Sequence, residues 1–178
     1  FSGTGTNLKS ILEHQKEYDY EVCSCFTNNP EAAGLSFCKE YKIDCKIIDH
    51  KNYNDREEYD GLINSYLENL NPDLIVLAGY MRIMSKSLVD NWEGQIVNIH
   101  PSLLPKYPGL NTHKRALEAK DKTHGSTIHF VTSELDSGPI IRQESFEIEP
   151  SDTEESLINK VKDLEHKIYP ETISLLIK

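Results

Sequence analysis

The chain has 178 residues, which is enough for a sizeable core, and we expect a single domain over residues 1–178. Its hydrophobic content of 38% and charged content of 27% are typical of globular proteins and argue against intrinsic disorder. The net charge of −10 argues against nucleic acid as a partner, because a nucleic-acid backbone requires a basic face. The longest apolar run, Leu74–Gly79, is too short to span a membrane, so we expect no membrane partner.

The cysteines and the start of the chain indicate a cytoplasmic protein. Cys23 and Cys25 lack the two-residue gap of a zinc or redox pair, and all four cysteines are expected to be reduced thiols. The sequence shows no signal peptide. It opens at Phe1, directly before a glycine-rich turn, so we also expect that most of a first strand is missing at the N-terminus.

In the first hundred residues, short β-rich runs alternate with helical runs. Helices are predicted at Asn7–Lys16, Pro30–Lys42, Asn54–Leu70 and Ser85–Asn91. Strands are predicted at Glu21–Thr27, Cys45–Asp49, Asp73–Tyr80 and Gln95–His100. The alternation predicts an α/β fold with a doubly wound, mostly parallel sheet of the Rossmann type and flanking helices. Ligands of such sheets bind beyond the carboxyl ends of the strands.

The second half of the chain predicts an antiparallel extension of this sheet. A short helix is expected at His113–Lys120, followed by strands at Gly125–Thr132 and Pro139–Ile148 that a glycine-containing loop connects. A long helical segment then covers Thr153–Lys178, and Pro170 within it predicts a break or a kink.

A glycine-rich turn precedes the first helix and predicts an anion site. Gly3 and Gly5 allow close backbone approach, and the free N–H groups at the helix start favour a negative charge. A dinucleotide fingerprint would need glycine where Leu8 stands, and the Lys-Ser/Thr pair of a P-loop is also absent. A monophosphate is therefore the better ligand, and an ordinary strand-to-helix turn is the alternative.

Asn98 and His100 are two residues apart at the end of a predicted strand, so both side chains point to the same face. An amide can donate to a developing oxyanion, and an imidazole can carry a proton near neutral pH. Asp136, on the loop between the last two strands, could stabilise the imidazolium if it came close to His100. The alternative is a capping Asn, a surface His and a turn-forming Asp.

Four other histidines, His50, His113, His124 and His129, raise the question of a metal site. None of them forms an HxxxH or HExxH pattern on a helix, so we expect no bound metal.

Five motifs together resemble one enzyme family along almost the whole chain: "SGTGTNL", "LAGYMRIMS", "NIHPSLLPKYPGLNTH", "HGSTIHFVTSELDSGPII" and "EHKIYP". The sequence is similar to the folate-dependent glycinamide ribonucleotide transformylases of purine synthesis. "HPSLLP" and "LDSGPI" also resemble the wider group that uses formyltetrahydrofolate, which includes methionyl-tRNA formyltransferase and formyltetrahydrofolate deformylase.

The resemblance implies direct formyl transfer, through a tetrahedral intermediate, from the co-substrate 10-formyltetrahydrofolate to the amine of glycinamide ribonucleotide. It implies catalytic roles for Asn98, His100 and Asp136. It assigns the substrate phosphate to Gly5, Thr6 and Asn7 and the glycinamide end to Lys162, Asp163, Leu164 and Glu165, with Glu165 at the amine. The folate would be bordered by Arg56 at its outer end and by Met81, Arg82, Ile83, Met84, Asn98, Thr132, Ser133, Glu134, Leu135 and Asp136.

Other functions stay open at this stage. Hydrolysis of formyltetrahydrofolate would use the same catalytic residues but would not need a phosphate site. Formylation of initiator tRNA is disfavoured by the acidic chain. A non-catalytic sugar-phosphate binding module would explain Gly3 and Gly5 but not Asn98, His100 and Asp136. For the enzyme we expect two small-molecule substrates and a monomer or a homodimer.

Overall fold

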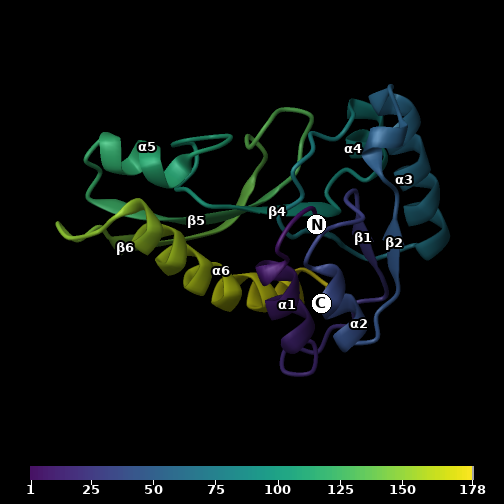
Figure 1. Ribbon diagram of the computed structural model, residues 1–178, viewed down its shortest axis with the longest axis horizontal. Coiled ribbons are helices and arrows are strands. Elements are labelled where there is room, and N and C mark those ends of the chain that lie inside the picture. The colour runs from purple at the N-terminus through teal and green to yellow at the C-terminus, as the bar shows by residue number, and fades with distance from the viewer. Residues whose placement is uncertain (178) are drawn as a thin grey trace.

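The computed structural model describes residues 1–177, and its first half alternates helices and strands as predicted (Figure 1). The elements of this half are α1 (Thr6–Glu13), β1 (Cys25–Thr27), α2 (Leu35–Glu40), β2 (Cys45–Ile47), a 3-10 turn at His50–Asn52, α3 (Arg56–Leu70), β3 (Ile75–Leu77), α4 (Lys86–Asn91) and β4 (Ile96–His100). The second half consists of α5 (Thr112–Glu118), β5 (Thr123–Phe130), β6 (Ile140–Glu147) and α6 (Glu154–Leu176).

The larger sheet combines parallel and antiparallel strands in the order β3-β4-β5-β6. β3 and β4 are parallel, whereas β5 and β6 add the predicted antiparallel extension. A separate parallel pair is formed by β1 and β2, and within residues 1–177 no ladder joins the two sheets. The predicted mixture of parallel and antiparallel strands is confirmed.

The edges of the two sheets meet at the start of the chain. The amino group of Phe1 donates to the carbonyl of Phe26 at 3.0 Å, and the N–H of Ser2 donates to the carbonyl of Gly79 at 3.0 Å. Beyond these bonds a cavity of about 410 Å³ lies between residues 20–26 and residues 70–78. β1 and β3 are shorter than predicted, and within residues 1–177 the residues that precede them beside this cavity belong to no ladder.

Helices cover both faces of the larger sheet. On one face, α1 and α6 pack against Val97 and Ile99 of β4. On the other face, α3 and α4 pack against Ile96. Because neighbouring residues of a strand point to opposite faces, this alternation gives the doubly wound arrangement that the sequence predicts. Figure 1 shows α6 running along the sheet beneath β5 and β6.

Of the break or kink predicted at Pro170, the break is wrong, because α6 continues through this residue, and the kink stays a prediction. Proline has no N–H and therefore leaves the carbonyl four residues earlier, that of His166, without its helical donor. The hydroxyl of Ser10 in α1 donates to this carbonyl at 2.7 Å. The bond to α1 satisfies the carbonyl, so the helix tolerates the proline. Lys178, the last residue of the predicted helix, lies outside the described residues.

None of the described helices is both long enough and apolar enough to span a membrane.

Candidate active site

The site lies at the carboxyl end of β4, where two other segments reach the same edge. Leu77, at the end of β3, is the register partner of Asn98, so the segment after β3 begins beside it. On the other side, Asn98 pairs with His129 of β5 and His100 pairs with Thr127. Asn98 and His100 thus sit between the segment after β3 and the hairpin of β5 and β6.

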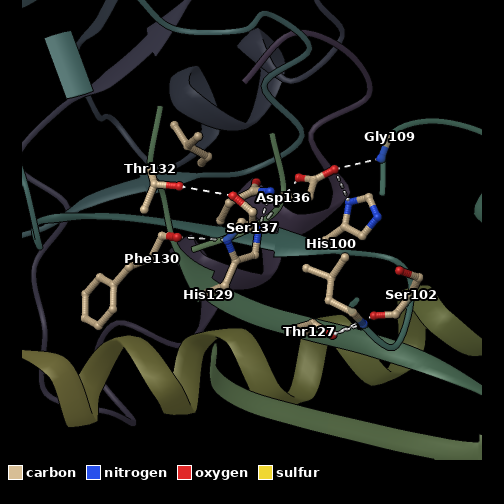
Figure 2. Close-up of polar contacts among 12 residues, drawn as sticks. His100, Ser102, Gly109, Thr127, His129, Phe130, Thr132, Asp136 and Ser137 are labelled. Atoms are coloured by element: carbon tan, nitrogen blue, oxygen red, sulfur yellow. Dashed lines mark hydrogen bonds and ion pairs between the residues drawn. The ribbon is translucent and has the colours of Figure 1, made fainter. Parts of the chain in front are cut away.

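Both ring nitrogens of His100 face acceptors, and Figure 2 shows the contact with Asp136. Nε2 lies 2.9 Å from the carbonyl oxygen of Tyr107, and Nδ1 lies 3.4 Å from Oδ2 of Asp136. A neutral imidazole can donate from only one nitrogen, whereas an imidazolium donates from both. A ring that carries both protons can therefore donate to both acceptors, and the side chain of His100 is only 7% exposed.

The carboxylate of Asp136 contacts a backbone N–H group as well as His100. Its Oδ2 accepts from the N–H of Gly109 at 2.8 Å, which ties the β5–β6 loop to the loop after β4. Gly138 makes this arrangement possible, because a Cβ there would lie 1.8 Å from the carbonyl oxygen of Phe130. The loop therefore turns tightly against β5. The structure thus brings Asp136 and His100 together, and their catalytic role stays a prediction.

His129 is a site residue that the sequence brought up only in connection with a metal site. Its Nδ1 lies 2.9 Å from the carbonyl of Phe130 and must donate to it, so Nε2 of the neutral ring is an acceptor. Nδ2 of Asn98 lies 3.3 Å from this Nε2. Burial lowers the pKa of His129, against the opposing effects of the Phe130 carbonyl and Asp136, which supports the neutral form. Only the register between β4 and β5 pairs His129 with Asn98.

The glycine-rich turn forms the start of α1. Gly5 has φ 74° and is the N-cap of the helix, and a Cβ on it would lie 2.7 Å from Cα of Gly34. Thr6 and Asn7 follow in the first turn, where backbone N–H groups have no helical acceptor. The side chain of Asn7 points toward α6, where its Nδ2 donates to Oε2 of Glu165 at 2.8 Å. This bond links the turn to α6.

Of the four predicted glycinamide residues, only Glu165 has a side chain buried in this region, with 6% exposure. Its Oε1 lies 2.9 Å from the hydroxyl of Ser126 in β5. Burial raises the pKa of Glu165, while the bonds from Asn7 and Ser126 and the charge of Lys162 act in the opposite direction. Lys162 and Asp163 are exposed, and Leu164 packs against the apolar core.

Several of the predicted folate residues are exposed, and some of these are apolar. The side chains of Met81, Ile83 and Leu135 are largely exposed, and Leu135 approaches the backbone of Gly109 beside the Asp136 loop. Thr132, Ser133 and Glu134 are exposed on that loop. The binding of folate by these residues stays a prediction.

Three other predicted folate residues lie differently. The guanidinium of Arg82 stacks on the ring of Tyr59 at 4.8 Å. Met84 packs against the core cluster of α3 and α4 instead of joining the exposed surface. Arg56 is exposed at the first position of α3.

His113 and His124 contact each other away from Asp136, with Nδ1 of His113 3.0 Å from Nε2 of His124. Residues 1–177 contain no group of three or more His, Cys, Asp or Glu side chains arranged to hold a metal ion.

Comparisons with known proteins show the family to which the chain is similar. The formyl transferase family matches residues 1–173. The chain is 42% identical over 171 residues to phosphoribosylglycinamide formyltransferase from Haemophilus influenzae, which covers 95% of this chain and 81% of that protein. It is also 42% identical over 177 residues to the trifunctional purine biosynthetic protein adenosine-3 from Gallus gallus. There the match covers 98% of this chain but only 18% of the relative.

The solved structures give the same result. Phosphoribosylglycinamide formyltransferase from Coxiella burnetii superposes with a TM-score of 0.94 at 43% identity, over 98% of this chain and 82% of that one. Glycinamide ribonucleotide transformylase 1 from Symbiobacterium toebii gives a TM-score of 0.95 at 37% identity, over 99% of this chain and 84% of that one. With the family match over almost its whole length, the chain belongs to the formyl transferase family.

Proposed function

We propose that the protein transfers a formyl group from 10-formyltetrahydrofolate to the amine of glycinamide ribonucleotide, a step of purine synthesis. The observation that carries this proposal is the meeting of three segments at one strand end. Asn98 and His100 end β4, Asp136 reaches His100 from the β5–β6 loop, and Glu165 is linked through Asn7 to the glycine-rich turn. A phosphate subsite, an amine subsite and an acid–base group would thus serve one substrate pair.

In the proposed mechanism Asn98 donates a hydrogen bond to the formyl oxygen as it becomes negatively charged. The imidazolium of His100, still held by Asp136, exchanges its contact with the Tyr107 carbonyl for a second hydrogen bond to this oxygen. The amine attacks the formyl carbon, a C–N bond forms, and the bond to N10 of the folate breaks. The amine loses a proton and N10 gains one, and His100, held by Asp136, is the group that relays it. Donors aimed at a developing oxyanion contribute roughly 10²–10³-fold to the rate.

In this proposal the turn Gly5–Asn7 binds the phosphate through backbone N–H groups, where the positive end of the α1 dipole favours an anion. The exposed apolar side chains of Met81, Ile83 and Leu135 support a folate site beside the catalytic group. Arg56, Arg82, Met84 and Thr132–Glu134 would border it. Folate carboxylates carry negative charge, which suits the two arginines.

We further propose that the enzyme works in the cytoplasm on these two small molecules, as a monomer or a homodimer. Four free cysteines among the described residues are compatible with a reducing compartment.

The direct test is to mix the protein with glycinamide ribonucleotide and 10-formyltetrahydrofolate and to follow the release of tetrahydrofolate. We expect release to require the ribonucleotide. His100→Ala should lower the turnover number by roughly 10²–10⁴-fold, because it removes both the acid–base group and an oxyanion donor. His14→Ala, at the C-cap of α1, is the matched control and should remain near wild type.

Two results would count against the proposal. Release of tetrahydrofolate without ribonucleotide would indicate hydrolysis, the alternative that uses the same catalytic group. Near-normal turnover by His100→Ala would remove the proposed role of this residue.

A further inference from the structure

The carboxyl group of Glu165 is surrounded by neutral hydrogen-bonding groups from α1 and β5. Its Oε2 accepts from Nδ2 of Asn7 at 2.8 Å, and its Oε1 lies 2.9 Å from Oγ of Ser126. Within residues 1–177, no Lys, Arg or His forms an ion pair with it. A carboxylate this deeply buried without a cation is costly.

The hydroxyl of Ser126 decides which form of Glu165 the site accommodates. Oγ lies 2.8 Å from the backbone carbonyl of His100 as well as 2.9 Å from Glu165. A carbonyl oxygen can only accept, and a serine hydroxyl carries a single hydrogen. If Glu165 were ionised, two acceptors would share that one hydrogen. If Oε1 is protonated, it donates to Ser126, Ser126 donates to His100, and every group is satisfied. Ser126 is fully buried, so solvent does not supply the missing donor.

We propose that Glu165 acts as a neutral carboxylic acid that orients the substrate amine without protonating it, with Ser126 as the positioning residue that holds its proton. This inference rests on the proposed function, because it assigns the amine of glycinamide ribonucleotide to Glu165.

The neutral form suits the chemistry of the attack. An ionised carboxylate would stabilise the ammonium form of the substrate, which has no lone pair with which to attack. In the neutral acid, Oε2 is the carbonyl oxygen, and its second lone pair accepts an N–H of the free amine. The nitrogen lone pair stays available for the formyl carbon. On binding, the substrate ammonium gives its proton to solvent, and Glu165 keeps its own.

Charged side chains around Glu165 have only a weak effect on its protonation. Burial raises the pKa of Glu165, and the charge of Lys162, exposed on the same helix, opposes it. Tyr169, one turn further along α6, is buried, which raises the pKa of its hydroxyl, so it stays neutral. The contacts from α1 and β5 are an amide and a hydroxyl, and β4 contributes a backbone carbonyl.

Glutamine is a close analogue of the proposed neutral acid, so Glu165→Gln is the first test. The amide N–H would donate to Ser126, and the amide oxygen would accept from Asn7 and the substrate. We expect kcat and KM for glycinamide ribonucleotide within about tenfold of wild type, which corresponds to about 1.4 kcal/mol. Glu165→Ala should lose much more. A glutamine variant as impaired as the alanine variant would overturn the proposal.

Proton counting by calorimetry gives a second readout. The ribonucleotide is titrated into wild type and Glu165→Gln in two buffers of different ionisation enthalpy, at a pH where the free amine is an ammonium. We expect both proteins to release close to one proton per bound substrate. No release by wild type would mean that Glu165 is ionised, and release by wild type alone would mean that Glu165 gives up its proton. Either result would overturn the proposal.

Infrared difference spectroscopy separates this inference from the proposed function. The carbonyl stretch of a protonated carboxylic acid should be present in wild type and absent in Glu165→Gln. The matched control Glu155→Gln changes an exposed carboxyl at the start of the same helix and should keep the band. If the carbonyl band is present but the protein does not bind the ribonucleotide, the proposed function is wrong and the neutral form of Glu165 stands. If the protein binds the ribonucleotide but the carbonyl band is missing, only the proposal that Glu165 is neutral is wrong.

Discussion

The two histidines that face Asp136 differ in the form that their contacts favour. His100 has an acceptor at each ring nitrogen, and the imidazolium is the form that satisfies both. His129 uses Nδ1 as donor to its own strand and presents Nε2 as an acceptor to Asn98. Because one hydrogen of the Asn98 amide points to His129, the direction of its second hydrogen is also set. One carboxylate thus lies between a ring suited to hold a proton and a ring that orients an amide.

At the scale of single residues, we predict that His129→Ala lowers kcat by about tenfold while KM for the folate changes little. The reason is that Asn98 loses the acceptor that fixes its rotation, and misplaced oxyanion donors cost transition-state stabilisation. Steady-state kinetics with both substrates varied provides the measurement. His129→Gln supplies an amide oxygen in place of Nε2 and should lose less. Equal and unchanged kcat values for both variants would contradict the assigned role of His129.

Helix α5 and strand β5 are joined by a pair of histidines, of which His124 is buried and His113 is half-buried. His124 packs edge-on against His113 and Phe146, with ring centroids at 5.1 Å and 6.1 Å. Burial, together with the smaller effect of the neighbouring His113, lowers the pKa of His124 to about 4, against the opposing effect of Asp121. Burial likewise lowers the pKa of His113. Both rings are therefore neutral in the fold at neutral pH, where one donates to the other.

This contact predicts an acid-sensitive stability. An unfolded histidine has a pKa near 6.5, so between about pH 6.5 and pH 4 the unfolded chain binds a proton that His124 in the fold does not. The stability that the fold gains from the neutral His124 is complete above pH 6.5 and is lost as the pH falls toward 4. We expect His124 to reduce the free energy of unfolding by about 2 kcal/mol between pH 8 and pH 5.

Urea denaturation at several pH values measures this effect. His124→Gln removes the titrating ring and serves as the reference for all other groups, so its stability should fall less steeply over the same range. Parallel pH curves for wild type and His124→Gln would exclude the predicted linkage.

Across the whole molecule, α6 connects the two halves of the larger sheet. The hydroxyl of Tyr169, buried in the core, lies 2.9 Å from the carbonyl of Leu77 in β3 and 3.2 Å from that of Val97 in β4. Four residues earlier on the same helix, Glu165 reaches Ser126 of β5. The helix therefore fixes the parallel pair and the antiparallel extension relative to each other, and with them the predicted amine and formyl subsites.

We predict that Tyr169→Phe lowers the free energy of unfolding by about 1–3 kcal/mol, because it leaves two buried carbonyls without their shared donor. Urea denaturation measures the loss. Tyr18→Phe, which alters a partly exposed tyrosine, is the matched control and should change stability by less than about 0.5 kcal/mol. Comparable losses in the two variants would contradict the role given to the Tyr169 hydroxyl.

The sequence by itself determined the order of the elements and the local geometry of the site. Alternating periodicities give the α/β architecture, since apolar spacing along a strand or helix is a local property. The strand period of two puts Asn98 and His100 on one face, and Gly5 marks the start of α1.

The tertiary structure alone decided the contacts between distant segments. His129 meets Asn98 only through the register of β4 and β5, and Ser126 reaches both Glu165 and His100 only because α6 crosses that sheet. Pro170 is tolerated because Ser10, remote in sequence, supplies the missing donor. These contacts depend on strand register and helix docking, which are set by packing across the whole molecule and leave no periodic signal in any one segment.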